Sequence, residues 1–387
     1  MDAFKYSFIL NGLVLRKLSV VYIYEIKDMF TVLIRHSHLK GRTIIKKRIV
    51  GLDAIKLIAC IGVVFLHVWA IPFIFEQGYS NALNLLPSQF IYYLGTISVP
   101  LFFMTNGYFL INRQNMNYLY IFKKIVAILI PVFLWNLLYW VFKVIKDGTT
   151  ENVFVLTLKS LVQKGYFFQF WFMGSLLLLL LLVPIFNFLM KSRQKTYFVI
   201  TLGFLLICFV LDSYNHFSNK QPIQSGIIQT FRLWTWCFYY LLGGLIGNKK
   251  FGKQIKYIFE KIKGSYLTIL LTILVPLYCM YNKTRFADAY AEFNYDNLFV
   301  IIWISFVFVA ILFWKPNYTI SKSVITFSSA SMGVYIVHAS ILKIVNHFID
   351  LRTPINNVLG IIIVLLLSFV LVLIMKKVPF VNKLVAL

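Results

Sequence analysis

The chain has 387 residues, of which 60% are hydrophobic and only 13% are charged, and its mean hydropathy is +0.80. This composition excludes an ordinary soluble globular protein and predicts a polytopic membrane protein. The formal net charge of +25 does not indicate a nucleic-acid-binding protein, because Lys and Arg stand in short clusters between apolar stretches. Such clusters determine which loops stay in the cytoplasm, and they attract anionic lipids. We therefore expect membrane lipids and no nucleic acid among the partners.

Residues 1–48 form a basic extension before the long apolar stretches begin. Its apolar runs are too short to span a bilayer and are interrupted by charges, so we expect a cytoplasmic or interfacial segment. The basic residues that lead up to the first long apolar stretch are Arg35, Lys40, Arg42, Lys46, Lys47 and Arg48. By the positive-inside rule, they place the start of that stretch on the cytoplasmic side.

Residues 51–75, GLDAIKLIACIGVVFLHVWAIPFIF, are long enough to span a bilayer yet contain Asp53, Lys56 and His67. Ionisable groups at membrane depth are costly and usually mark function. Lys56 and His67 are eleven residues apart, so they project from one helix face and lie about 17 Å apart along its axis. We interpret Lys56 as a cation near the cytoplasmic face and His67 as a base farther out. The alternatives are that Lys56 reaches the interface or pairs with Asp53, and that His67 is a hydrogen-bonded core residue.

Nine further stretches are apolar and long enough to be spans, and their number places both termini in the cytoplasm. They are about residues 88–112, 119–143, 169–190, 196–213, 227–247, 265–281, 297–314, 327–349 and 357–375. The loops assigned to the inside carry most of the loop Lys and Arg residues, as the positive-inside rule requires. We therefore predict an all-α integral membrane protein with about ten transmembrane helices. Its parts are the extension 1–48, a membrane domain 49–377 and a short cytoplasmic tail 378–387.

Several polar residues within or next to the later spans are further site candidates. His338 lies near mid-membrane with Tyr335 one turn before it, which predicts a polar layer that faces the bundle interior and supports a site. Arg232 cannot lose its proton, so it needs a partner or an aqueous cavity. It either binds an anionic or hydroxyl-rich ligand near the outer face or pairs structurally, for instance with Asp212.

The fourth predicted span opens on an aromatic run that contains Gln169 and Trp171. Aromatic residues at the start of a span ordinarily form an interfacial belt, but a Trp beside a Gln can also stack on a sugar face. The sequence has no phosphate-binding loop, no dinucleotide-binding glycine motif and no cluster with metal-ligand spacing, so we expect no metal.

An ordered set of short motifs resembles the membrane-bound acyltransferase 3 family over about residues 48–377. The motifs are Lys56-x10-His67 preceded by RIVGLD, the stretch VPLFFMTNGY at 99–108, Ile130-Pro131 with Trp135, Trp171-Phe172, Leu242-Gly243 and Ser331-x-Gly333-x-Tyr335-x-x-His338. The resemblance implies a bacterial, multi-pass enzyme of the cytoplasmic (inner) membrane. It implies an O-acyltransferase that uses cytoplasmic acyl-CoA, usually acetyl-CoA, to modify sugars of surface polysaccharide, lipopolysaccharide or peptidoglycan.

In that family the basic residue and the His of the first helix are the functional pair, which implies these roles for Lys56 and His67. The sequence departs from the family at Gln169, where His is frequent, and at Lys123 and Lys124, where Arg is more frequent.

We expect His67 to act as general base or transient acyl carrier, because a partly desolvated His can do either. The phosphates of CoA need cations, which Lys56, Lys123 and Lys124 can supply. Acyl-CoA is then the donor substrate, the acceptor is a surface glycan or lipid-linked sugar, and no permanently bound cofactor is expected.

The expected supporting or substrate-binding residues are Asp53, Gln169, Trp171, Arg232, Tyr335 and His338. The alternative is a transporter of polysaccharide or lipid-linked sugar without chemistry, since intramembrane charges also mark transport paths.

Overall fold

The computed structural model describes residues 48–75, 86–148, 151–218, 222–286 and 290–385, with the backbone alone at 69–75 and 284–286. Every regular element in these ranges is a helix, so the predicted all-α class is confirmed. The predicted extension 1–48 lies outside them except for Arg48. The predicted boundaries of the extension, the membrane domain and the tail stay predictions.

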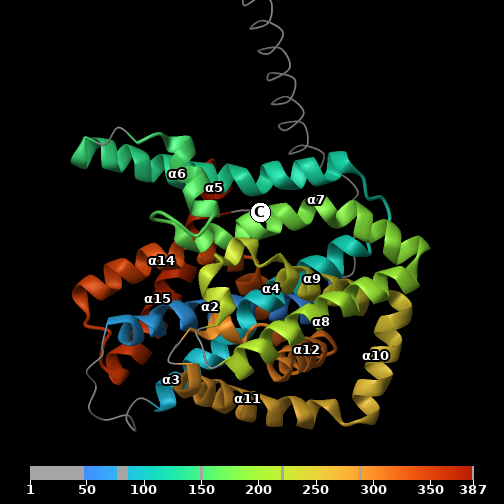
Figure 1. Ribbon diagram of the computed structural model, residues 1–387. Helices are drawn as coiled ribbons and strands as arrows, with labels where there is room; N and C mark the ends of the chain where they lie inside the picture. The colour runs from blue at the N-terminus through green and yellow to red at the C-terminus, as the bar shows by residue number, and fades with distance from the viewer. Residues whose placement is uncertain (1–47, 76–85, 149–150, 219–221, 287–289, 386–387) are drawn as a thin grey trace, which may run out of the picture. The chain divides into compact units, whose positions relative to one another are not determined.

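The helices follow one another with short connections, and Figure 1 shows their arrangement. The α-helices are α2 (Val50–Phe75), α3 (Leu86–Leu94), α4 (Ser98–Ile111), α5 (Tyr118–Asp147), α6 (Val153–Leu161), α7 (Trp171–Ser192), α8 (Gln194–Ser218), α9 (Leu233–Gly247), α10 (Lys249–Lys261), α11 (Gly264–Phe286), α12 (Leu298–Leu312), α13 (Tyr318–Ser328), α14 (Ser331–Phe348) and α15 (Pro354–Met375). The short 3₁₀ helices are η2 (Gly95–Ile97), η3 (Phe168–Phe170), η4 (Ile223–Gly226), η5 (Gln229–Phe231), η6 (Ala291–Asn294) and η7 (Val381–Leu384).

Many helix starts have an Asn or Thr side chain that accepts a hydrogen bond from the first turn. Such a cap satisfies a backbone N–H that has no partner inside the helix. The caps are Asn117 on α5, Asn152 on α6, Asn248 on α10, Asn297 on α12, Asn317 on α13 and Thr353 on α15. These short polar residues therefore fix where the capped helices begin in the sequence.

Seven helical segments in the described residues are long and apolar enough to cross a membrane, and an eighth consists of α13 and α14. These two helices meet at an angle of 57°. The helices α9 and α12 are apolar but have only 15 residues each. Each of the ten apolar stretches predicted from the sequence is thus mostly helical. That all ten cross the membrane, and that both termini are cytoplasmic, stay predictions.

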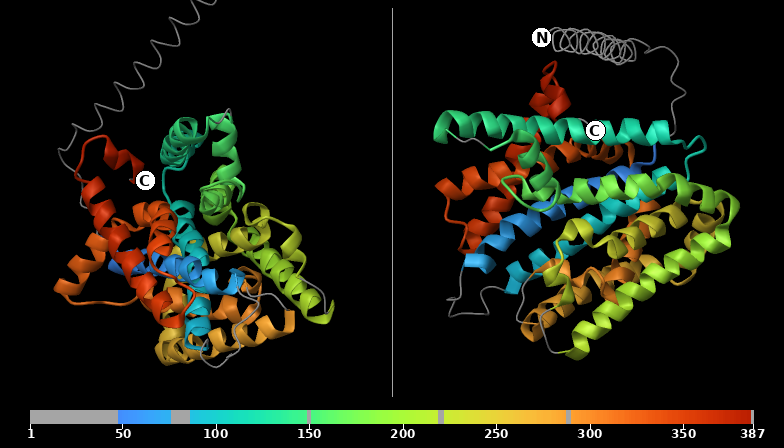
Figure 2. Two further views of the ribbon diagram at one scale, coloured as in Figure 1. Left: turned by 90° about the vertical axis from the view of Figure 1, so that its left-hand side faces the viewer. Right: turned by 45° about the horizontal axis from the view of Figure 1, so that its top comes forward.

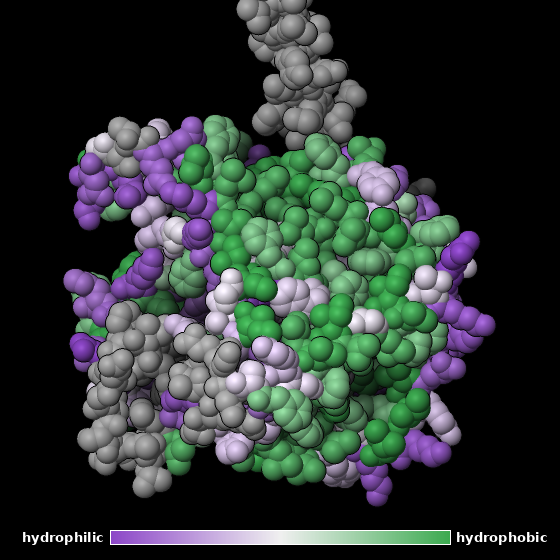
Figure 3. Space-filling view, viewed as in Figure 1, coloured by the Kyte–Doolittle hydropathy of each residue, from purple (hydrophilic) through white to green (hydrophobic). Residues whose placement is uncertain are grey.

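The hydrophobic surface is arranged as expected for a protein embedded in lipid. In Figure 3, hydrophobic residues cover the middle of the visible face, and hydrophilic residues gather at its left and right edges. The spans α5, α8 and α11 are mostly unburied, so their apolar side chains face outward. Because water would not tolerate this much exposed apolar surface, the chain is a multi-pass membrane protein.

The helix α10 differs from the spans in composition and direction. Figure 1 shows it at the right edge, where it runs across the ends of neighbouring helices. Its sequence KKFGKQIKYIFEK places Lys residues on one face, while Phe251, Ile255 and Phe259 pack against the bundle on the other. A basic amphipathic helix of this kind is typical of the membrane interface.

The helix α2 occupies the centre of the bundle, where it contacts α3, α4, α12, α13, α14 and α15. The two views of Figure 2 show it, in blue, between the red α15 and the cyan α4. The helix α4 is in turn pressed against α9. A Cβ atom on Gly107 would lie 1.9 Å from the carbonyl oxygen of Tyr240, and one on Gly243 would lie 2.0 Å from that of Met104. Only glycine permits this approach, as is common between membrane helices.

Candidate functional site

A cavity of about 630 Å³ lies beside the second half of α2, which is the end predicted to face outward. Its wall is formed by α2, α14, the start of α7 and the segments before α9 and α12. Among its lining residues are His67, Tyr92, Phe168, Trp171, Glu292 and Tyr335. The volume lies within the range of about 300–1,000 Å³ that is usual for pockets that bind small ligands.

His67 reaches this cavity from α2 and has a second histidine behind it. The ring centres of His67 and His338 are 4.9 Å apart, and the planes are tilted by 52°. The ring of Phe168 lies 5.5 Å from that of His67. The predicted polar layer that faces the bundle interior therefore includes His67 as well as His338 and Tyr335.

His338 is fully buried, and hydrogen bonds to its own helix fix its ring. Its Nδ1 atom lies 2.7 Å from the carbonyl oxygen of Tyr335 and 3.2 Å from that of Val334. A carbonyl oxygen can only accept, so Nδ1 carries the proton and Nε2 of the neutral ring carries a lone pair. Nε2 has no hydrogen-bond partner among the described residues.

Tyr335 and Gln169 connect α14 to the segment that begins α7. The hydroxyl of Tyr335 donates to the carbonyl oxygen of Gln169, and Nε2 of Gln169 donates to the carbonyl oxygen of Ile336 at 3.3 Å. Gln169 lies in η3, at the start of the candidate membrane span Phe168–Ser192 that continues into α7. Its side chain is buried and joins two elements, which is a supporting position.

Trp171 contributes an apolar wall of the cavity. Its ring packs 5.3 Å from that of Trp236, whose indole N–H donates to the carbonyl oxygen of Gln229 at 2.7 Å. The predicted alternative of an exposed interfacial belt does not describe Trp171, which is buried against the core and lines the cavity. An aromatic wall beside hydrogen-bonding groups suits the apolar face of a sugar ring.

Arg232 holds the opposite wall in place through Glu292. Its Nη2 atom lies 3.0 Å from Oε1 of Glu292, and its guanidinium also donates to the carbonyl oxygens of Gln224 and Ile227. The side chain of Gln229 donates to the other carboxylate oxygen of Glu292. Both Gln229 and Glu292 line the cavity.

Two expectations for Arg232 are wrong in detail. The residue precedes α9, which begins at Leu233, instead of lying inside a span that begins near residue 227. The structural pairing that the sequence offered as an alternative is present, but the carboxylate is that of Glu292 and not that of Asp212, which accepts a hydrogen bond from Asn297 at 2.9 Å. The cause is that the segment before α9 folds into η4 and η5, which turns Arg232 towards the segment before α12.

The cavity reaches the protein surface at one end. Lys343, Asn346 and Tyr290 line it and are exposed. Nζ of Lys343 lies 3.5 Å from the centre of the Tyr166 ring, a cation–π contact. Deeper in the cavity, burial raises the pKa of Tyr295, so its phenol stays neutral and able to donate.

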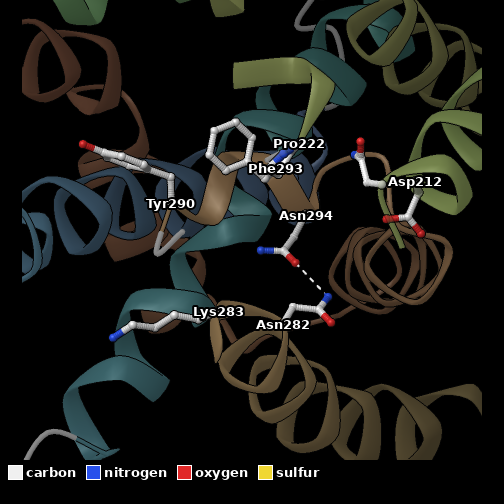
Figure 4. Close-up of a pocket in the computed structure, with 8 residues that line it drawn as sticks. Asp212, Pro222, Asn282, Lys283, Tyr290, Phe293 and Asn294 are labelled. Atoms are coloured by element: carbon white, nitrogen blue, oxygen red, sulfur yellow. Dashed lines mark hydrogen bonds between the residues drawn. The ribbon is translucent and has the colours of Figure 1, made fainter. Parts of the chain in front are cut away.

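A smaller pocket beside the cavity shares Tyr290 with it. Figure 4 shows Asn282 and Asn294 facing each other there, and Nδ2 of Asn282 donates to Oδ1 of Asn294 at 3.2 Å. Its volume of about 10 Å³ leaves room for about one water molecule. The polar side chains of this pocket therefore serve to join α11 to the segment before α12.

Lys56 and Asp53 lie elsewhere on α2, away from the residues that line the cavity. Nζ of Lys56 is 3.9 Å from Oδ1 of Asp53, and the hydroxyl of Ser328 donates to the same carboxylate oxygen at 3.0 Å. Lys56 also lies over the ring of Phe109 at 5.2 Å. Lys56 thus pairs with Asp53, which is one of the alternatives that the sequence left open, and its side chain is 35% exposed.

Lys123 and Lys124 lie near the start of α5 and are exposed. Nζ of Lys124 is 6.0 Å from the centre of the Tyr120 ring, and the guanidinium of Arg113 is 3.9 Å from that centre. These cations belong to a different part of the bundle from His67 and do not line the cavity.

The sequence predictions missed Glu292, Gln229 and Lys343, which all line the cavity. Glu292 and Gln229 lie in loops, and no periodicity distinguishes such positions. Lys343 could have been identified from the sequence, because a Lys five residues beyond an intramembrane His on a predicted span is unusual. In the described ranges, no group of three or more His, Cys, Asp or Glu side chains could hold a metal ion.

Comparison with known proteins gives this site its chemical context. An amino-acid racemase of Enterococcus faecalis is 24% identical over 345 residues, which cover 84% of this chain but 46% of the racemase. This chain therefore spans less than half of that relative's length. No solved structure matches significantly. A family model described as an acyltransferase domain matches residues 49–376, from just before α2 to just after α15. On this match, the chain belongs to the membrane-bound acyltransferase 3 family.

Proposed function

We propose that this acyltransferase transfers an acetyl group from cytoplasmic acyl-CoA to a sugar hydroxyl of a cell-surface polysaccharide or its lipid-linked precursor. The proposed location is the bacterial cytoplasmic membrane. The observation that carries the proposal is the position of His67, a titratable group on the wall of a cavity large enough for a small ligand. Family membership supports acyl transfer, and the cavity supports a sugar as the acceptor.

The walls of the cavity offer the two kinds of contact that sugars need. Trp171 and Phe168 present aromatic surface, which packs against the C–H face of a sugar ring. Gln229 and Glu292 offer polar groups on the opposite wall, where hydroxyl groups can hydrogen-bond. One acceptor ring between these walls would bring a hydroxyl towards His67.

The proposed reaction needs one base and one leaving group. A lone pair on His67 takes the proton of the acceptor hydroxyl, and the oxygen attacks the carbonyl carbon of the thioester. The C–S bond breaks, and the CoA sulfur leaves with the electron pair and receives the proton from His67. The products are an acetyl ester on the sugar and free CoA. In the alternative mechanism, His67 is a transient acyl carrier: it attacks the thioester itself and then passes the acyl group to the hydroxyl.

The donor is proposed to enter from the opposite end of α2. Lys56, Lys123 and Lys124 are the cations assigned to the phosphates of CoA. Lys56 and His67 are separated by about 17 Å of helix, so the two residues act at different points along the donor rather than as a dyad. The extended arm between the phosphates and the thioester would bridge that distance.

Membrane lipids are the remaining proposed partner. The Lys face of α10 would meet anionic headgroups of the leaflet on its side, where each basic residue near the surface contributes about 1 kcal/mol. Its apolar face packs on the bundle and holds the helix in that position.

The decisive experiment compares the surface glycans of cells that produce wild-type protein, no protein or the variant His67→Ala. We expect mass spectrometry to find an acetyl ester that depends on wild-type protein and disappears with His67→Ala. The matched control is His347→Ala, which changes an exposed histidine outside the cavity and should leave acetylation intact.

Two results would contradict the proposal. Unchanged acetylation in the His67→Ala cells would remove His67 from the chemistry. Glycans that lack acetyl groups in all strains but reach the surface only with wild-type protein would favour the alternative, a transporter.

A further inference from the structure

The side chain of His338 contains a buried acceptor that no described residue satisfies. Nδ1 is anchored to the backbone of α14, so Nε2 carries a lone pair that points away from its own helix. Nε2 has no hydrogen-bond partner among the described residues, although the residue is completely buried. Burying a polar atom without a partner costs free energy, so such an atom calls for a physical explanation.

His67 is the neighbouring side chain that can provide the missing donor. Two imidazole rings joined by an N–H···N bond of about 2.9 Å have their centres about 5 Å apart. The observed separation of the centres is 4.9 Å, so the rings already have the spacing of a hydrogen-bonded pair. The ring of His338 is held by two carbonyl oxygens, so the orientation of the His67 ring decides whether the bond forms.

We propose that His338 is a positioning residue for His67, whose ring N–H it accepts at Nε2. This inference rests on the proposed role of His67. In the neutral imidazole one nitrogen is a donor and the other is an acceptor. An N–H committed to His338 therefore leaves the lone pair of His67 on the other nitrogen, which faces the cavity.

The bond also has a role during transfer. When His67 takes the proton of the acceptor hydroxyl, its ring becomes cationic, and the N–H towards His338 becomes a stronger donor. A bond that strengthens as the charge develops lowers the barrier without tightening the binding of the substrate. The contribution of His338 should therefore appear in kcat and leave KM nearly unchanged.

Two substitutions separate this role from a purely structural one. The amide of Asn can occupy the position of Nδ1, so His338→Asn keeps the donor to the backbone and removes the acceptor near His67. The longer Gln can place its amide oxygen at the position of Nε2, so His338→Gln keeps that acceptor and loses the anchor. The positioning role predicts that Gln preserves the properties of His67 better than Asn does, and a structural role predicts the reverse.

The first measurement does not depend on acyl transfer. Diethyl pyrocarbonate ethoxycarbonylates the unprotonated nitrogen of an imidazole, and mass spectrometry of the labelled full-length protein gives the rate at His67. We expect His338→Asn to slow the labelling of His67 about 10-fold or more, and His338→Gln to stay within about threefold of wild type. His347, exposed on the same helix, serves as the internal reference, because its labelling should not change.

The second measurement is transfer of acetyl from acetyl-CoA to glycan by the same proteins in membranes. We expect kcat to fall about 10- to 100-fold in His338→Asn and less in His338→Gln, with KM for acetyl-CoA unchanged in both. The control His347→Asn should behave like wild type.

Equal labelling of His67 in wild type and His338→Asn would overturn the proposal, as would faster transfer in the Asn variant than in the Gln variant. The two measurements also keep this inference apart from the proposed function. Absence of transfer in wild type would refute the proposed function alone, whereas the labelling rates would still decide whether His338 positions His67.

Discussion

The two halves of α2 hold their ionisable side chains in opposite circumstances. Near the start of the helix, the carboxylate of Asp53 accepts from Ser328 and lies 3.9 Å from the ammonium of Lys56, which also covers the ring of Phe109. Further along, His67 stands on a cavity wall beside His338, whose Nε2 has no partner in the described part of the chain.

The difference between the two halves of α2 indicates that Lys56 and His67, which belong to one sequence motif, have different roles. Groups that satisfy one another contribute binding and stability, whereas hydrogen-bonding capacity that remains unmet in a cavity is available to a substrate. On the proposed mechanism, the eleven-residue spacing of Lys56 and His67 is the distance between a donor-binding end and a reactive end of one helix. Substitutions at each end should then have different effects on kcat, KM and stability.

The largest effect is expected from His67→Ala. Removal of a general base typically slows a reaction about 10²- to 10⁴-fold, so kcat for acetyl transfer should fall by that factor while the protein keeps its unfolding temperature. Initial rates with purified protein in lipid nanodiscs, together with thermal unfolding, provide the measurement. A variant that retains more than a tenth of the activity would show that the reactive end is elsewhere.

The second largest effect is expected at the cavity wall, from Arg232→Met. The substitution removes the guanidinium partner of the Glu292 carboxylate. Removing one partner of a fully buried pair costs about 3–5 kcal/mol, and because the Glu292 side chain is 19% exposed we expect a loss of about 3 kcal/mol, at the lower end of that range. The double variant Arg232→Met with Glu292→Gln should recover much of the loss, because it also removes the carboxylate charge that the guanidinium balances. Thermal unfolding in detergent compares the three proteins, and a double variant no more stable than the single one would contradict the pairing.

The sequence predicted most of the fold because each apolar stretch is long and bounded by polar residues. The mean hydropathy of a window of residues could not reveal that α13 and α14 meet at 57°. The break at Ser329 and Ala330 falls within a stretch whose mean hydropathy stays high on both sides, so the two helices look like one span. It also could not reveal that α9 and α12 are short. The positions of Asn248 and Asn297, which mark the boundaries of these helices as caps, were present in the sequence.

The sequence identified single residues of the candidate site, but it did not predict which of them contact one another. His67, Tyr335 and His338 were singled out because polar groups on apolar stretches are rare, and the structure brings them to one place. The partner of Arg232 could not be chosen from the sequence, because Glu292 is 60 residues away and nothing ranks it above Asp212. Contacts between distant segments follow from tertiary packing, which spacing along the chain does not encode.

A smaller effect is expected from Gly107→Ala, which tests the packing of α4 against α9 beside the central helix α2. The added Cβ would meet the carbonyl oxygen of Tyr240 at 1.9 Å, so α4 must move away from α9 at a cost of about 1–3 kcal/mol. Gly203→Ala in α8 is the matched control, because no atom lies within 4 Å of the position of its Cβ. Thermal unfolding should separate the two variants. Equal stability would mean that the helices are not in backbone contact at Gly107.

The smallest effect on stability is expected from Lys56→Gln. The Lys56 side chain is 35% exposed, and a pair of this exposure contributes less than about 1 kcal/mol. If Lys56 binds the phosphates of the donor, the substitution should instead raise KM for acetyl-CoA about tenfold and leave kcat nearly unchanged, while Lys56→Arg keeps the charge and should stay close to wild type. Steady-state kinetics with acetyl-CoA as the varied substrate measure both constants. A fall in kcat at unchanged KM would place Lys56 with His67 in the chemical step, and the division of α2 into a binding end and a reactive end would then be wrong.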